Sequence, residues 1–492
     1  MTESVAPGQT VGASPDGPGP AHELRRGALG VGFVVFFVVS AAAPLTALAG
    51  GVPVGMLLGN GAGMPGLFAF VTVLLLVFAA GYTAMARHVR NAGSFYAFAS
   101  VGLGKPAGGA AGLIALLGYN CMQVGLYGLF GVASAGLLAE FGVELPWWAY
   151  AYAALALVAV LGYRRIDLSA KVLAVLVIAE YLIMIVFDVA VIGQGGADGL
   201  NTVPFQGPTV LSGSPSIGLL FCFAAFLGFE ASTIYSEEAK DPRRTVPTAT
   251  FISILVIGLF YTFSSWCTVM AAGAGQLSDT LAAIGDPTTL LFTLAEQYAG
   301  PLVTRIMQFL FVSSIFAALV AFHNAVSRYF YVLGREGLLH GHLGRTHGRH
   351  QSPHMGSVLQ TAMALVIVTI FAVAGSDPVL TLFSWLTNLA TLCVIALMVF
   401  ASFAVVVHFR GKPDRTESPA RILVLPIVAG LALLTILVLA IVNFSVLTGA
   451  SEGLAWALTG LLPLAGILGV VLATRLRRAD PQKYARLGSN RL

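Results

Sequence analysis

Long apolar stretches recur along almost the whole sequence, and they restrict the possible folds more than any other feature. Each stretch is close to the roughly 20 residues that a helix needs to cross a bilayer. We count about twelve, near residues 31–58, 65–86, 107–139, 147–163, 169–193, 216–235, 248–272, 302–332, 356–375, 379–407, 420–446 and 453–474. The sequence therefore predicts an all-α membrane protein with about twelve transmembrane helices.

The composition excludes several classes of protein. With 57% hydrophobic and 10% charged residues, the chain is unlike a soluble domain. It has no basic tract with interleaved aromatic residues, so a nucleic acid is not expected as a partner. The four cysteines lie singly in apolar stretches, without metal-ligand spacing. We expect the lipid bilayer as a partner, and no metal or other cofactor.

The basic residues predict the orientation of the chain. If the N-terminus is cytoplasmic, every Lys and Arg except Arg305 falls in an inner loop or a terminal tail, as the positive-inside rule requires. We therefore predict a multi-pass protein of the plasma (inner) membrane with both termini in the cytoplasm. Residues 1–28, rich in Gly, Pro and Ser, are predicted to form a disordered cytoplasmic tail.

Two of the apolar stretches are interrupted. The first contains Ala41-Ala42-Ala43-Pro44-Leu45-Thr46, in which Pro44 cannot donate a helix hydrogen bond. The sixth contains Gly228-Phe229-Glu230, with Ser232 close behind, and a carboxylate at that depth is costly unless it has a function. Matched interruptions in two halves of a chain are typical of the substrate site of a secondary transporter. The alternative is that neighbouring helices simply compensate for these residues.

Three blocks of sequence resemble a known family. Gly228-Phe229-Glu230 precedes Glu237-Glu238 and the run Lys-Asp-Pro-Arg-Arg-Thr-Val-Pro at 240–247. The second block, 324–339, contains Arg328-Tyr329 and Gly-Arg-Glu-Gly, and the third spans 91–104. Together with the twelve stretches they resemble the amino acid–polyamine–organocation (APC) transporter superfamily over about residues 30–475.

The resemblance implies a LeuT-type fold, with two inverted five-helix repeats, broken helices 1 and 6, and two peripheral helices. On that basis we expect a transporter domain at 29–475, made of repeat one (30–195), repeat two (215–408) and peripheral helices (419–475), before a basic cytoplasmic tail at 476–492. In the family the first break binds the substrate carboxylate and the sixth helix receives the amino group. Alanines at 41–43 replace the glycines of many relatives, which favours a substrate without a carboxylate.

Candidate functional residues follow from these arguments. Glu230 could bind the substrate amine or a proton, or could be a structural carboxylate. Glu180 lies where many relatives carry lysine, and could bind and release the coupling proton or hold structure. Asp188 is expected nearer the outer face, as a solvated or interfacial group. Further candidates for the substrate cavity are Asn120, Gln123, Phe226, Phe229 and Ser313, besides the residues of the two breaks.

Charged residues at the cytoplasmic mouth form a candidate inner gate, namely Glu237, Glu238, Arg243 and Arg328. The alternative for these four is a solvated surface. Six histidines between 323 and 354 fit no zinc-site spacing and are expected in a polar inner loop.

The sequence is thus interpreted as a secondary active transporter that moves an amino acid or small organic amine by alternating access, with proton-coupled uptake. The alternatives are an obligate amino acid/polyamine exchanger, a transporter of a carboxylate-free amine, and a nutrient-sensing receptor. A channel would need a filter loop or a continuous polar stripe, and an enzyme would need clustered catalytic groups. Neither is present in the sequence, and the oligomeric state is left open.

Overall fold

Helices dominate the computed structural model, which describes residues 30–89, 94–164, 170–234, 240–347, 352–410, 417–449 and 452–488. Within those ranges no β-strand occurs. The first half of the chain forms α1 (Val31–Ala41), η1 (Thr46–Gly51), α2 (Val52–Gly55), η2 (Met56–Asn60), η3 (Gly61–Gly63), α3 (Met64–Ala86), α4 (Ser94–Gly102), α5 (Lys105–Ala139), α6 (Trp147–Arg164), α7 (Ala170–Gln194), η4 (Val203–Phe205), α8 (Gly207–Val210), α9 (Pro215–Ala225) and α10 (Ala231–Ile234).

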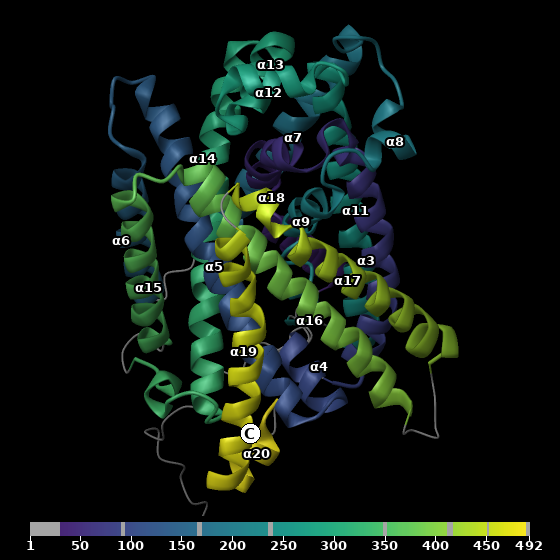
Figure 1. Ribbon diagram of the computed structural model, residues 1–492, viewed down its shortest axis with the longest axis vertical. Helices are drawn as coiled ribbons and strands as arrows, with labels where there is room; N and C mark the ends of the chain where they lie inside the picture. Colours follow the sequence, from purple (N-terminus) through teal and green to yellow (C-terminus); the bar gives the residue numbers. More distant parts are fainter. Residues whose placement is uncertain are drawn as a thin grey trace, which may run out of the picture.

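The second half continues in the same way (Figure 1). Its elements are α11 (Pro242–Ala272), α12 (Leu277–Ile284), η6 (Pro287–Thr289), α13 (Leu290–Ala299), α14 (Pro301–Arg335), η7 (Gly341–Gly344), α15 (His354–Val373), η8 (Pro378–Phe383), α16 (Ser384–Arg410), η9 (Ala420–Val424), α17 (Leu425–Val442), α18 (Phe444–Thr448), α19 (Glu452–Ala479) and α20 (Pro481–Arg486).

Each of the twelve predicted stretches contains helix, so the multi-pass all-α prediction is confirmed. Among the described residues, nine helices are long and apolar enough to cross a membrane by themselves. The other three stretches are the two interrupted ones, with α1 and α9 as their first halves, and the 18-residue α6. The protein is therefore a multi-pass membrane protein.

The core lies where α3, α5, α9, α11, α14 and α16 pack against one another. The α6–α15 pair stands at one side of this bundle, and α17 and α19 cover another (Figure 1). A Cβ on Gly469 of α19 would lie 2.2 Å from the backbone oxygen of Gly109 on α5. Small residues let helix backbones approach this closely inside a membrane. The pair therefore fixes the peripheral α19 directly onto the core.

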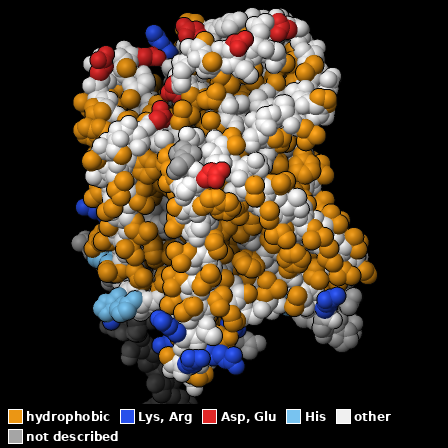
Figure 2. All heavy atoms as spheres, viewed as in Figure 1, with side chains coloured by type: hydrophobic (Ala, Val, Ile, Leu, Met, Phe, Trp, Pro, Cys, Tyr) orange, Lys and Arg blue, Asp and Glu red, His pale blue; other side chains and the backbone are white. Residues whose placement is uncertain are grey.

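Charges separate toward the two ends of the molecule (Figure 2). In this view the acidic side chains gather near α12 and α13, whereas Lys, Arg and His gather at the end that carries α20. A broad hydrophobic band lies between them. Exposed apolar side chains on the long helices include Val175, Val366 and Ile467. The segment 273–300 carries the two short helices α12 and α13.

Leu487 and Gly488 pack against the end of the bundle that carries α4. Leu487 is fully buried, its carbonyl accepts a hydrogen bond from Lys105, and the backbone N–H of Gly488 donates to Glu336 over 3.0 Å. Asp480 caps α20 by accepting from the Lys483 backbone N–H at 2.9 Å, and this bond lowers the pKa of its carboxyl. The basic C-terminal segment is thus a docked element up to residue 488.

Candidate functional site at the two broken helices

The first break separates α1 from the outer half of the same stretch. Ala43 has φ +44°, and it is the one non-glycine residue with positive φ in the described part of the chain. This left-handed conformation costs an alanine roughly 1–2 kcal/mol. The turn frees the Ala42 carbonyl, which accepts a hydrogen bond of 2.9 Å from the Tyr261 hydroxyl of α11. The expected interruption at 41–46 is therefore present, and α11 holds it open.

Glu180 of α7 lies directly at this break. One of its oxygens, Oε2, accepts hydrogen bonds from the Leu45 backbone N–H at 3.2 Å and from the Ser314 hydroxyl at 2.8 Å. The Thr46 hydroxyl donates to Ser314 over 3.0 Å and extends the chain of contacts. Glu180 is 2% exposed. The carboxylate thus occupies the N-terminal end of the outer half-helix, where free backbone N–H groups attract an anion.

The second break lies between α9 and α10. Gly228 has φ +108°, a conformation that glycine adopts without strain. Glu230 is 3% exposed, and its Oε2 accepts from the Gly228 backbone N–H at 2.9 Å. Its Oε1 accepts from the Tyr119 hydroxyl of α5 at 2.6 Å. The costly carboxylate predicted for the sixth helix is therefore buried and satisfied by two donors.

The two aromatic candidates beside this break pack into the wall of the bundle. The Phe226 ring lies 6.1 Å from the ring of Tyr261, and the Phe229 ring lies 6.2 Å from that of Tyr82. Both phenylalanines are at most 2% exposed. Tyr82 also reaches the second break, because its hydroxyl lies 3.4 Å from the Glu230 carbonyl oxygen. Aromatic packing therefore joins the two breaks.

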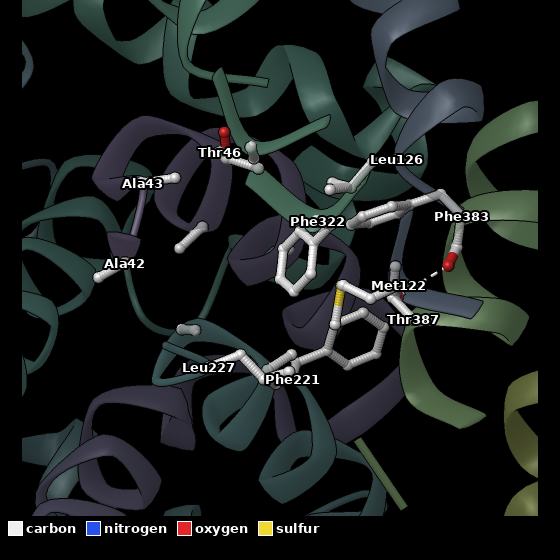
Figure 3. A pocket seen from close by; sticks show the side chains of 15 residues that line it. Ala42, Ala43, Thr46, Met122, Leu126, Phe221, Leu227, Phe322, Phe383 and Thr387 are labelled. Carbon is white, nitrogen blue, oxygen red and sulfur yellow. Dashed lines mark hydrogen bonds between the residues drawn. The ribbon is translucent and has the colours of Figure 1, made fainter. Parts of the chain in front are cut away.

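A small cavity of about 60 Å³ lies beside the breaks (Figure 3). That volume has room for a few water molecules. The Phe322 ring stands between the Ala43–Thr46 side and the Met122–Thr387 side of the cavity. Its lining is mostly apolar, and the full set is Ala42, Ala43, Thr46, Ala47, Gly51, Met122, Leu126, Phe221, Ala224, Ala225, Leu227, Ala318, Phe322, Phe383 and Thr387. Neither Glu180 nor Glu230 is among these lining residues.

Several sequence candidates lie apart from the cavity. Asn120 donates to the Leu116 carbonyl of its own helix at 2.6 Å. Ser232 contacts Thr250 at 2.7 Å. Ser313 donates to a carbonyl of its own helix, so its neighbour Ser314 is the serine that reaches the break.

Gln123 belongs to a separate polar cluster between α5, α14 and α15. Its Nε2 lies 3.2 Å from Nδ1 of His323, and its Oε1 accepts from Gln360. Nε2 of His323 lies 2.8 Å from the Ser357 hydroxyl. The expectation of a polar loop fails for this histidine, which is 1% exposed inside α14. The sequence could not show this, since its partners are 34 and 200 residues away.

The candidate inner gate is only partly covered by the structure. Glu237 and Glu238 lie outside the described residues, and both Arg243 and Arg328 are exposed. On the same side, Glu417 binds Arg87 at 2.8 Å and Arg421 at 3.0 Å. The sequence did not reveal these two ion pairs, because Arg87 and Glu417 are 330 residues apart.

Asp188 requires a correction. It was expected to be solvated or interfacial, but it is 1% exposed and its Oδ2 accepts from the Ser264 hydroxyl at 2.6 Å. The side chain faces α11 instead of the outer surface. Among the described residues, no three His, Cys, Asp or Glu side chains come together as a metal site.

Comparison with known proteins finds a matching family model and several relatives. The family model described as "Amino acid permease" matches residues 30–471. The low-affinity putrescine importer PlaP of Escherichia coli (strain K12) is 26% identical over 420 residues, covering 82% of this chain and 85% of PlaP. The branched-chain amino acid permease BcaP of Bacillus subtilis is 27% identical over 417 residues, covering 80% of this chain and 83% of BcaP. The methylthioribose transporter of Bacillus subtilis is 23% identical, covering 70% of this chain and 73% of that protein.

Proposed function

The chain belongs to the amino acid permease family, and we propose that it imports a small organic amine across the plasma membrane by proton-coupled alternating access. The observation that carries this proposal is the placement of one buried carboxylate at each helix break: Glu180 reaches the first break from α7, and Glu230 lies within the second. Glu180 binds the first break through Leu45, and Glu230 binds the second through Gly228. Discontinuous helices with ionisable groups at membrane depth are the usual substrate and ion sites of secondary transporters.

The charge of the site supports a cationic substrate. Both side chains that bind the breaks are acids, and none of the Lys or Arg residues that the structure describes is buried. A substrate carboxylate at the first break would compete with Glu180 for the Leu45 N–H and would be repelled by it. An ammonium group would instead be attracted by the acidic side chains at the breaks. Among the relatives, a putrescine importer has this kind of substrate.

Glu230 is assigned to the substrate amine. In the present conformation its oxygens are held by Tyr119 and by the Gly228 N–H. An ammonium group offers three donors and a charge, so it can replace the Tyr119 hydroxyl as the stronger partner. The cavity has to enlarge beyond its present 60 Å³ for that contact to form. Substrate binding is therefore expected to move the α10 side of the break against α5.

Glu180 is assigned to the coupling proton. As a carboxylate it accepts from both the Leu45 N–H and Ser314, and so it ties α7 and α14 to the outer half of the first helix. A proton on Glu180 removes the negative charge that favours this half-helix end. The tie then weakens, and the outer half-helix can move relative to α7. Protonation is in this way linked to opening and closing of the site.

The proposed orientation places α20 and both termini in the cytoplasm. It is supported by the separation of basic and acidic side chains in Figure 2. The test uses a cysteine at exposed Asp279 of α12 or exposed Gln482 of α20, because the native cysteines are all buried. A membrane-impermeant maleimide applied to intact cells should label only Asp279→Cys. Labelling of only Gln482→Cys would reverse the orientation.

A ligand screen tests the substrate class. Purified protein is heated with putrescine, ethanolamine, leucine or glycine, since a ligand that prefers the folded state raises the unfolding temperature. The proposal expects putrescine or ethanolamine to raise it and the two amino acids to leave it unchanged. Stabilisation by leucine alone would contradict the assignment of a carboxylate-free amine.

A further inference from the structure

The transport proposal leaves unused a third buried carboxylate, that of Asp188. Asp188 is eight residues after Glu180 on α7, which corresponds to about 12 Å along the helix, toward the α12–α13 end. Its Oδ2 accepts from Ser264, whereas its Oδ1 is buried without an N–H or O–H donor, and the Cys267 thiol is a weak partner of the carboxyl. A buried carboxyl with a free oxygen is expensive to keep unless it exchanges protons or binds a partner.

Buried polar side chains on α11 lie between Asp188 and the first break. On α11, Tyr261, Ser264 and Thr268 follow the spacing of one helix face, and each is at most 1% exposed. Ser264 contacts Asp188, and Tyr261 contacts the Ala42 carbonyl at the break. We call these side chains, with Tyr181 of α7, the α7–α11 polar lane.

Tyr181 lies within the lane next to the coupling carboxylate. Its hydroxyl is buried without a hydrogen-bond partner, and it lies close enough to Glu180 and Tyr261 to interact with both electrostatically. The lane therefore holds two polar groups without an N–H or O–H donor or an oxygen acceptor, the Tyr181 hydroxyl and Asp188 Oδ1. Both could hold water or pass a proton when the helices separate slightly.

Among the described residues of the helices that pack on α7, no charged side chain pairs with Asp188. On α11 the nearby titratable side chain is the Cys267 thiol. On α13 the Tyr298 hydroxyl donates to Ala271, and on α14 Arg305 is exposed and faces Glu140. In the described residues the first helix brings no charge to this point. Asp188 is thus a carboxyl without a counter-ion, free to change its protonation state.

We propose that Asp188 is a second proton-carrying carboxylate, which passes protons from the α12–α13 side to Glu180 along the α7–α11 polar lane. The inference rests on the proposed proton coupling at Glu180. A proton taken up by Asp188 moves to the Glu180 carboxylate, which leaves Asp188 ionised and ready for the next proton. In this conformation the outer end of the lane is covered, because Gln194 donates to the Tyr298 carbonyl of α13 at 2.7 Å.

The test compares Asp188→Asn with wild type in proteoliposomes, using labelled putrescine as the probe. Two rates are measured: uptake driven by an acidic exterior, and counterflow at equal pH, which needs no net proton movement. Asp198→Asn is the matched control, because Asp198 is exposed in the loop after α7 and outside the lane. We expect Asp188→Asn to lose at least tenfold in driven uptake and to keep counterflow within twofold. The Asp198→Asn control should keep both driven uptake and counterflow at the wild-type rates.

Conservative variants keep the result interpretable. Asp188→Glu should restore driven uptake with a shifted dependence on external pH. If Asp188→Asn does not fold, Ser264→Ala should shift that same external pH dependence without changing counterflow. Unchanged driven uptake in Asp188→Asn, or an equal loss of uptake and counterflow, would overturn the inference. Wild-type protein that counterflows putrescine but ignores the pH gradient would instead overturn proton coupling itself.

Discussion

Two buried carboxylates and their hydrogen-bond donors are the main polar groups at the two breaks. Glu230 receives hydrogen bonds from Tyr119 and Gly228, and Glu180 receives them from Ser314 and Leu45. Glu180 therefore joins the first broken helix to the intact helices α7 and α14. Glu230 joins the turn of the second break to α5. An acid that is satisfied in the empty state can exchange one donor for a substrate or a proton without leaving a buried charge unpaired.

Glu230→Gln tests the amine assignment. The amide keeps the size of the side chain but removes the charge that the substrate ammonium pairs with, so we expect putrescine uptake to fall at least tenfold. Glu296→Gln, at an exposed position of α13, is the matched control and should transport normally. Wild-type uptake by folded Glu230→Gln would contradict the assignment.

Ser314→Ala tests the contact between α14 and the first break. The substitution removes a donor to Glu180 and the acceptor of Thr46, so the external pH dependence of uptake should shift. Ser313→Ala is the adjacent control, because that hydroxyl binds only the Leu310 carbonyl of its own helix. Equal effects of the two substitutions would argue against a specific role for Ser314.

The serine pair also shows where sequence reasoning ends. The apolar pattern places both serines in the eighth stretch, but it does not determine which one faces the break. That depends on the rotation of α14, which is set by packing against α5, α7 and α15. Glu180 and Glu230 could be found from sequence because any carboxylate in an apolar stretch is costly. Their donors could not, because Leu45 and Tyr119 are 135 and 111 residues away.

At the scale of elements, the first break depends on the conformation of Ala43. Ala43→Gly should be tolerated, since glycine adopts φ +44° without the alanine's strain. Ala43→Val should lower the free energy of unfolding by on the order of 1–3 kcal/mol, because a β-branched residue fits that region poorly. The midpoint of thermal or denaturant unfolding of the purified protein measures both. A fully stable Ala43→Val variant would show that the turn is not required.

The docked C-terminal segment is a second element with a testable role. Leu487 is buried beside Tyr96 and Leu333, so it ties α4 and α14 to the end of the chain. Leu487→Asp should release the segment, because burying a carboxylate there costs several kcal/mol. Trypsin should then cut faster at Lys483 and Arg486, both in α20. Gln482→Asp, at an exposed position, is the control. Unchanged cleavage of Leu487→Asp would mean that the segment does not depend on this contact.

Element lengths follow from the sequence more closely than element partners do. The predicted stretch 147–163 corresponds to the observed helix Trp147–Arg164, and the stretch 302–332 corresponds to Pro301–Arg335. The agreement arises because a helix that crosses the bilayer needs a long apolar run, which the sequence shows directly. The burial of Asp188 against α11 was not foreseen. Its partner Ser264 lies 76 residues away, and polar residues within a span give no sign of which helix they face.

At the scale of the whole molecule, the charges of the bundle are unevenly distributed. In the view of Figure 2 one end is richer in acidic side chains and the other is richer in basic ones, and the chain also buries the acids Glu180, Asp188 and Glu230. This distribution matches a membrane protein that draws cations, both organic amines and protons, into its interior. The amino acid permease family supplies the architecture. We propose that the acids at the breaks select the substrate of this member of the family.

The most direct test of this account is uptake of labelled putrescine by proteoliposomes that contain the purified protein, with the exterior at pH 5.5 or 7.5 and the interior at pH 7.5. The account predicts accumulation only with the acidic exterior, its loss when a protonophore collapses the gradient, and its loss in Glu180→Gln. Equal uptake with and without the gradient, or gradient-driven uptake that Glu180→Gln leaves intact, would contradict proton coupling at the first break.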